Sequence, residues 1–129
     1  MSNKVNQVLI NGVILSSVAI PHLIDDFLFG IPEEFDLTNI QTQIMAGIFT
    51  AVLVVVFSLV ARGHRWDLIA AGFLGGFLAL AGTLKHVPLI LQSGPYWSGV
   101  FSEVLIWALI VSGISLVIVT IRATRSLPR

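Results

Sequence analysis

The chain has 129 residues, of which 56% are hydrophobic, and its acidic and basic residues balance to a formal net charge of zero. A hydrophobic share this high is typical of membrane proteins, and the length leaves no room for a second domain. Because the chain has no cysteine, disulfides, thiolate metal sites and iron–sulfur clusters are excluded. The basic residues form no continuous stripe, which argues against nucleic acid as a partner.

Four apolar blocks are each long enough to cross the hydrocarbon core of a bilayer, which is about 30 Å thick, at about 1.5 Å per helical residue. They cover approximately residues 5–24, 40–61, 68–91 and 99–121. We therefore expect an all-α integral membrane protein with a single transmembrane domain, residues 1–129. Its four transmembrane helices would form an up-down-up-down bundle embedded in the lipid bilayer.

The charged residues between the blocks are segregated by sign. If the N-terminus is cytoplasmic, six of the seven basic residues fall on the cytoplasmic side, and Lys85 is the exception. Six of the seven acidic residues fall on the outer side, with Asp67 as the exception. The positive-inside rule then predicts a multi-pass protein of the cell membrane with both termini in the cytoplasm.

The first block ends in a group of polar residues. Pro21 lacks a backbone N–H, so we expect the helix to kink or stop near the membrane surface. Asp25 and Asp26 follow, and further acidic residues bracket the apolar stretch 27–32, as is typical of a segment lying in the headgroup region. This acidic connection lacks the regular spacing of a calcium-binding loop, so calcium is a weak alternative.

Two short patterns set the boundaries of the middle blocks. Thr38 with Gln41 three residues later is a capping box, which predicts a helix start near Ile40. Gly63 suits a left-handed cap at the end of that helix, and Asp67 suits the N-cap of the next. Because the connection is short, we expect the second and third helices to be antiparallel neighbours.

Small residues repeat along the third block. Gly72 and Gly76 form a GxxxG pair, and Gly75 with Ala79 forms a second small-xxx-small pair one position further on. Such a face could associate with a second copy of the chain. We favour close packing within one chain instead, because a small four-helix bundle needs a helix that its neighbours can approach closely.

Ionisable residues inside a membrane are costly and are candidates for a functional site. The helical rise places Lys85 and Glu103 at nearly the same depth, so we expect them to pair. The candidate ligand-binding residues at the outer ends of the blocks are His22, Asp25, Asp26, Lys85, His86 and Glu103. The segment 27–29 and the pair Tyr96-Trp97 could cover such a pocket.

Four interpretations of these polar residues remain open. They could be purely structural, with Lys85 extending to the membrane surface and Glu103 favoured by its helix dipole. His22 and His86 could be axial ligands of a b-type haem. His22, His86 and Glu103, with Asp25 or Asp26, could bind zinc or non-haem iron. Lys85 and the histidines could instead bind an anionic headgroup, a substrate or a quinone.

The second and fourth blocks are apolar nearly all round, which predicts that they face lipid or partner helices. Our first hypothesis is therefore an accessory or scaffold subunit of a larger membrane complex or homo-oligomer, whose partners are other membrane-protein chains or further copies of itself. The alternative is an outer-leaflet ligand-binding or catalytic bundle. The lack of nucleophile-elbow, metalloprotease and phosphate-loop motifs favours a non-enzymatic role and identifies no catalytic residue or cofactor.

Overall fold

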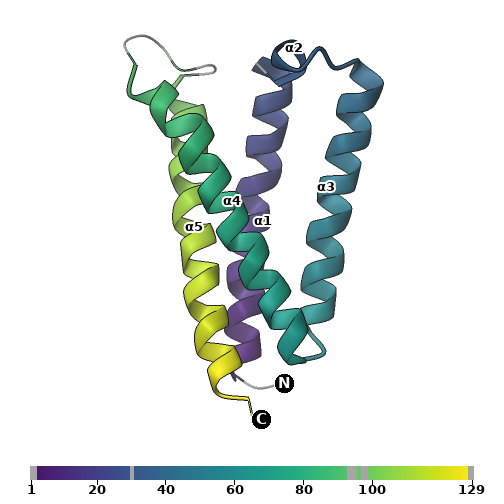
Figure 1. The fold of residues 1–129 in the computed structure, drawn as a ribbon, viewed down its shortest axis with the longest axis vertical. Coiled ribbons are helices and arrows are strands. Elements are labelled where there is room, and N and C mark those ends of the chain that lie inside the picture. Colours follow the sequence, from purple (N-terminus) through teal and green to yellow (C-terminus); the bar gives the residue numbers. More distant parts are fainter. Residues whose placement is uncertain (1–2, 30, 93–95, 97–98, 128–129) are drawn as a thin grey trace.

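The computed structural model describes residues 3–29, 31–92, 96 and 99–127. These residues form four long helices, α1 (Asn3–Phe29), α3 (Asn39–Val60), α4 (Arg65–Ile90) and α5 (Val100–Arg125), and one short helix, α2 (Ile31–Glu34). The four long helices are long and apolar enough to cross a membrane, as the sequence predicts. Consecutive long helices run in opposite directions, so α1 begins and α5 ends at the same end of the molecule (Figure 1). We call the opposite end, where α2 lies, the α2 end.

Helix α1 continues past Pro21 to Phe29, beyond the end that the sequence predicts near residue 24. A proline within a helix removes its own backbone donor, while the remaining backbone groups still need partners in apolar surroundings and keep their helical bonds. The extension has a direct consequence for the polar residues that follow. Asp25 and Asp26 are helical residues, held in fixed register with His22.

The boundaries of α3 and α4 match the sequence patterns with one exception. The capping box is present, since the backbone N–H of Gln41 donates to the Thr38 hydroxyl at 3.3 Å and the Gln41 side chain accepts from the Thr38 backbone at 2.8 Å. Gly63 has the expected left-handed conformation, with φ of 71°. The prediction for Asp67 was wrong, because α4 starts earlier, with His64 as N-cap, and Asp67 lies in its first turn. There its carboxylate still interacts favourably with the helix dipole.

Helices α4 and α5 are in close contact at Gly75 and Gly113. A Cβ atom added at Gly113 would lie 2.5 Å from the Gly75 carbonyl oxygen, and one added at Gly75 would lie 2.9 Å from the Gly113 carbonyl oxygen. A Cβ added at Gly72 would lie 2.9 Å from the Thr120 side chain. The small residues of α4 therefore serve packing within one chain, as we expected.

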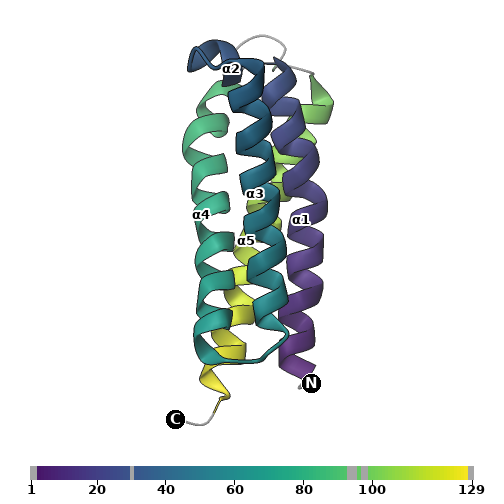
Figure 2. The ribbon, with the colours of Figure 1, turned by 90° about the vertical axis from the view of Figure 1, so that its right-hand side faces the viewer.

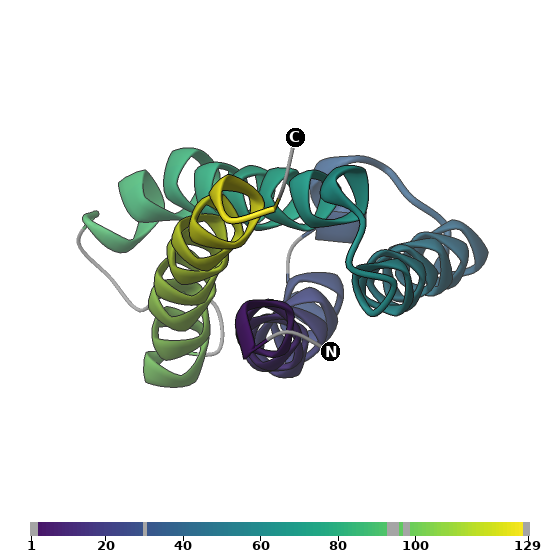
Figure 3. The same ribbon diagram turned by 90° about the horizontal axis from the view of Figure 1, so that it is seen from below.

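Helix α5 buries one face within the chain, with 44% of its most apolar stretch buried, whereas the sequence predicted that the second and fourth blocks both face lipid or partner helices. It packs between α1 and α4, and Ser115 on α5 donates a hydrogen bond to the Asn11 side chain on α1 at 2.6 Å. Small residues on one side of α5, among them Ser112 and Gly113, permit this approach. By contrast, only Leu53 and Val60 of α3 are buried. Figures 2 and 3 show α3 beside α1 and α4, on the side away from α5.

Candidate metal centre

Three buried polar side chains meet between α1 and α4 near the α2 end: His22 and Asp26 from α1 and His86 from α4. Oδ2 of Asp26 lies 3.6 Å from Nε2 of His22 and 3.7 Å from Nε2 of His86. One ligand atom from each residue lies within 4.8 Å of those of the other two. The three residues are only 4–6% exposed. We call this group the His–Asp–His cluster.

The helical register explains why these residues meet. His22 and Asp26 are separated by four positions, so they lie on one face of α1, one turn apart. His86 lies on the buried face of α4, four positions after the buried Gly82. The two helices thus place two imidazoles and a carboxylate opposite one another, an arrangement typical of metal sites built inside helix bundles.

Tyr96 holds the His86 ring in place. Its hydroxyl is hydrogen-bonded to Nδ1 of His86, and the two rings meet edge to face with centroids 6.2 Å apart. Burial raises the pKa of Tyr96, and the carboxylates of Asp26 and Asp25 raise it further, so the phenol stays protonated. When Nδ1 of His86 carries the ring proton and donates to this phenol, the Nε2 lone pair is directed toward Asp26.

Asp25, next to the cluster in sequence, belongs to a different contact. The hydroxyl of Ser102 on α5 donates to Oδ2 of Asp25, and both residues are buried. Asp25 and Asp26 therefore act on different neighbours, since consecutive positions on a helix point about 100° apart. The role of Ser102 could not be predicted from the sequence, because an isolated serine near a helix start has many possible partners.

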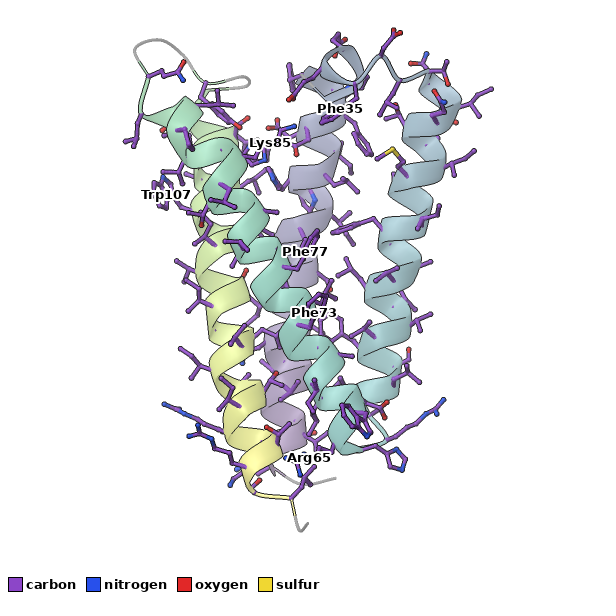
Figure 4. The ribbon with its side chains drawn as sticks, in the orientation of Figure 1. Phe35, Arg65, Phe73, Phe77, Lys85 and Trp107 are labelled. Atoms are coloured by element: carbon purple, nitrogen blue, oxygen red, sulfur yellow. The ribbon has the colours of Figure 1, made fainter. Side chains whose placement is uncertain are left out.

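The predicted ion pair between Lys85 and Glu103 was wrong. Nζ of Lys85 instead lies 2.8 Å from Oε2 of Glu34, and it sits 4.7 Å from the centre of the Phe35 ring. Figure 4 shows Lys85 reaching from α4 toward α1, with Phe35 above it. Helix α2 brings Glu34 to the lysine, which a comparison of depths alone could not predict. Glu103 lies in the first turn of α5 and is not among the converging ligand atoms.

The covering residues also differ from expectation. Leu28 and Phe29 are exposed and Phe27 is half-buried, and none of the three lines the cavity beside the cluster. Tyr96 is buried and contacts His86. The prediction for Trp97 concerns a residue outside the described part of the chain.

The His–Asp–His cluster has unmet hydrogen-bonding capacity. The two distances to Asp26 are longer than a hydrogen bond. Nδ1 of His22 and Oδ1 of Asp26 are buried and have no hydrogen-bond partner among the described residues. A buried polar atom left in this way costs about 1–3 kcal/mol. A cation between the three side chains would contact Oδ2 of Asp26 and the two Nε2 atoms that face it, which are not the two unpartnered atoms.

The geometry of the cluster distinguishes between the haem and the metal ion that the sequence left open. The rings of His22 and His86 are in edge-to-face contact, with centroids 4.9 Å apart, which leaves no room for a porphyrin between them. A tetrahedral ion with ligands at about 2.0–2.2 Å would place its ligand atoms about 3.4 Å apart, close to the two distances measured to Asp26. The cluster therefore fits a small metal ion and does not fit a haem.

A cavity of about 610 Å³ adjoins the cluster between α1, α3 and α4. His22, Asp26, Lys85 and His86 line its polar part, and apolar side chains line the rest. A cavity of about 640 Å³ lies between α1 and α3, but its lining residues, all from the described part of the chain, include no ionisable side chain. Of these two cavities, the one of about 610 Å³ therefore adjoins the candidate metal ligands.

Comparison of the chain with protein-family models, with curated proteins and with solved structures gave no match in any of the three.

Proposed function

We propose that this protein binds a first-row divalent metal ion, zinc or iron(II), within the membrane through His22, Asp26 and His86. The observation that carries the proposal is the convergence of three buried ligand atoms, with Oδ2 of Asp26 at 3.6 and 3.7 Å from Nε2 of His22 and Nε2 of His86. Two imidazoles and one carboxylate form a ligand set used for catalytic zinc and for non-haem iron(II).

The charges of the side chains near the His–Asp–His cluster favour binding of a divalent cation there. Asp25, Asp26 and Glu34 are carboxylates at this end of the bundle, and Lys85 is the ammonium group beside them. With neutral imidazoles, these groups leave a formal excess of two negative charges. A divalent cation would neutralise it, and neutralisation matters because uncompensated charge in apolar surroundings is expensive.

Each residue has a distinct role in this proposal. His22, Asp26 and His86 bind the ion directly, while Tyr96 fixes the orientation and tautomer of His86. Such outer contacts tune metal affinity in known sites. Three protein ligands leave a fourth tetrahedral position open, as in sites where a metal ion contacts a substrate or water rather than only supporting the fold.

We also propose that the protein lies in the cell membrane with both termini in the cytoplasm. The support is the distribution of basic residues: Arg65 begins α4, and Arg122 and Arg125 lie in the last turn of α5, all at the end opposite α2. In this orientation the His–Asp–His cluster lies in the outer half of the membrane.

Membership in a larger membrane complex or homo-oligomer is a second proposal. Its support is α3, of whose most apolar stretch only 11% is buried within the single chain. Lipid would cover this helix equally well, so the metal proposal has the stronger structural basis. Native mass spectrometry in mild detergent would decide, because bound chains would add polypeptide mass and a lone chain would not.

Zinc binding to the purified protein tests the metal proposal. The protein is prepared without a polyhistidine tag, stripped with a chelator and titrated with zinc against a chromophoric competitor. We expect one tight site per chain, lost in Asp26→Asn. His64→Ala is the matched control, because the His64 side chain is 73% exposed and lies far along α4 from His86. Equal zinc binding by all three proteins would overturn the proposal.

A further inference from the structure

We infer that the cavity beside the His–Asp–His cluster binds a membrane amphiphile whose oxygen-bearing head reaches the bound metal and whose tail lies between α3 and α4. This inference rests on the proposed metal function and names the class of ligand that the site would take. Its basis is the two-part character of one cavity, which is polar where α1 and α4 present the cluster and apolar elsewhere.

The apolar part of the cavity fits a hydrocarbon tail. Its volume of about 610 Å³ is within the range of small-molecule sites. Met45 and Phe49 from α3 and Phe77 from α4 are among its walls. Figure 4 shows Phe73, Phe77 and Lys85 following one another along α4, so an apolar side leads up to the polar end.

The position of the cavity favours a ligand that arrives from the bilayer. Its walls belong to α1, α3 and α4, with Leu109 from α5, and each of these helices is long and apolar enough to span a membrane. Helix α3 is the least buried of the four, so this wall of the cavity is the least tightly packed against the rest of the chain. At the α2 end, the Lys85–Glu34 ion pair and the Phe35 ring lie over the polar part.

The polar part of the cavity determines which head group the amphiphile can have. The cluster supplies three ligands, so a metal ion there retains an open position that an oxygen donor can fill. Once a divalent cation has compensated the excess negative charge, an additional ionic head would bring charge without a partner. We therefore assign a head that is neutral in the membrane and carries a carbonyl or hydroxyl oxygen, as in a long-chain alcohol or a prenyl quinone.

Two probes with the same head and different tails test this inference. Acetamide and dodecanamide both offer a neutral head whose carbonyl oxygen can coordinate zinc, but only the second has a long tail. Binding is measured on the zinc-loaded and metal-free protein in phosphatidylcholine nanodiscs. We expect the long probe to bind the zinc form at least about tenfold more tightly than the short one, because its tail is buried in the cavity.

Ala81→Trp should fill the apolar part of the cavity from the exposed side of α4. We expect it to retain zinc affinity and lose the advantage of the long probe. Ala51→Trp is the control, because Ala51 is exposed on α3 and does not line this cavity. An undiminished advantage in Ala81→Trp, or equal binding of the long probe with and without zinc, would overturn the inference.

The zinc titration distinguishes failure of the metal proposal from failure of the amphiphile inference. If the chain binds zinc and the two probes bind equally, only the amphiphile inference fails. If the chain binds no zinc, the metal function itself fails. With zinc and probe binding established, competition by dodecanol and by a prenyl quinone would distinguish the two sources of the oxygen head.

Discussion

His22 and Asp26 lie one helical turn apart on α1, with Nε2 of the imidazole 3.6 Å from Oδ2 of the carboxylate, although Pro21 immediately precedes them. The pair exists only because α1 remains helical beyond the proline. His86 completes the group from α4, and Tyr96 anchors His86 from the connection to α5. The candidate metal centre therefore depends on three separate parts of the chain.

Tyr96→Phe should weaken zinc binding without abolishing it. The substitution removes only the hydroxyl that contacts Nδ1 of His86, so the ring loses the partner that fixes its tautomer and orientation. Changes of this kind typically cost about 10–100-fold in metal affinity. Competitive zinc titration measures the effect, with Phe35→Leu as a control outside the cluster. Unchanged affinity in Tyr96→Phe would remove Tyr96 from the proposed site.

The phenol of Tyr96 should ionise only at unusually high pH. It is the chain's single tyrosine, so the phenolate absorbance reports on this residue alone. Its pKa is raised in the folded protein by burial and by the Asp26 and Asp25 carboxylates. Because the folded-state pKa lies above the unfolded value of about 10, this group's contribution to stability is present below about pH 10 and is lost as the pH rises further.

Spectrophotometric titration of the folded protein in detergent tests that shift. Asp26→Asn should bring the midpoint closer to the ordinary value, since one of the carboxylates that disfavour the phenolate is removed. A midpoint near pH 10 in the unsubstituted protein would show that Tyr96 is solvated and not packed against His86.

Gly113→Leu should destabilise the bundle. Even a Cβ at this position would lie 2.5 Å from the Gly75 carbonyl oxygen, so a larger side chain must force α4 and α5 apart. We expect a loss of about 1–3 kcal/mol in the free energy of unfolding, typical of overpacking. Gly47→Leu on α3 is the matched control, because a Cβ there has no atom within 4 Å among those described. Thermal unfolding in detergent should separate the two variants, and similar midpoints would contradict the close approach.

The absence of cysteine makes the membrane orientation directly testable. Glu33→Cys places a thiol on α2, and His64→Cys places one in the connection between α3 and α4. A membrane-impermeant maleimide should label the first in intact cells and the second only after permeabilisation. The reverse pattern would invert the proposed orientation and move the metal centre to the cytoplasmic half.

The four long helices could be predicted from the sequence because each apolar block is long enough on its own to span a bilayer. Local patterns such as the Thr38–Gln41 capping box were equally readable, since their partners are three residues apart. The packing of α5 was not predictable, because hydropathy does not say which side of an apolar helix carries the small residues that neighbours approach.

The sequence allowed the residues of the candidate site to be predicted. It did not allow their arrangement in space to be predicted. Depth along the membrane selected His22, Asp26 and His86, but their convergence depends on how α1 and α4 are rotated about their axes. Depth also suggested Glu103 as the partner of Lys85, whereas Glu34 occupies that place because α2 folds back over the bundle. Hydropathy carries no information about such a connection.

X-ray absorption at the zinc edge of the loaded protein observes the ligands of the proposed metal centre themselves. We expect one zinc per chain with two imidazole ligands and oxygen donors at about 2.0–2.2 Å. One imidazole should be lost from the spectrum in His86→Ala and none in His64→Ala. A zinc surrounded only by oxygen, or a spectrum unchanged by His86→Ala, would contradict the assignment of His22, Asp26 and His86 as a metal centre.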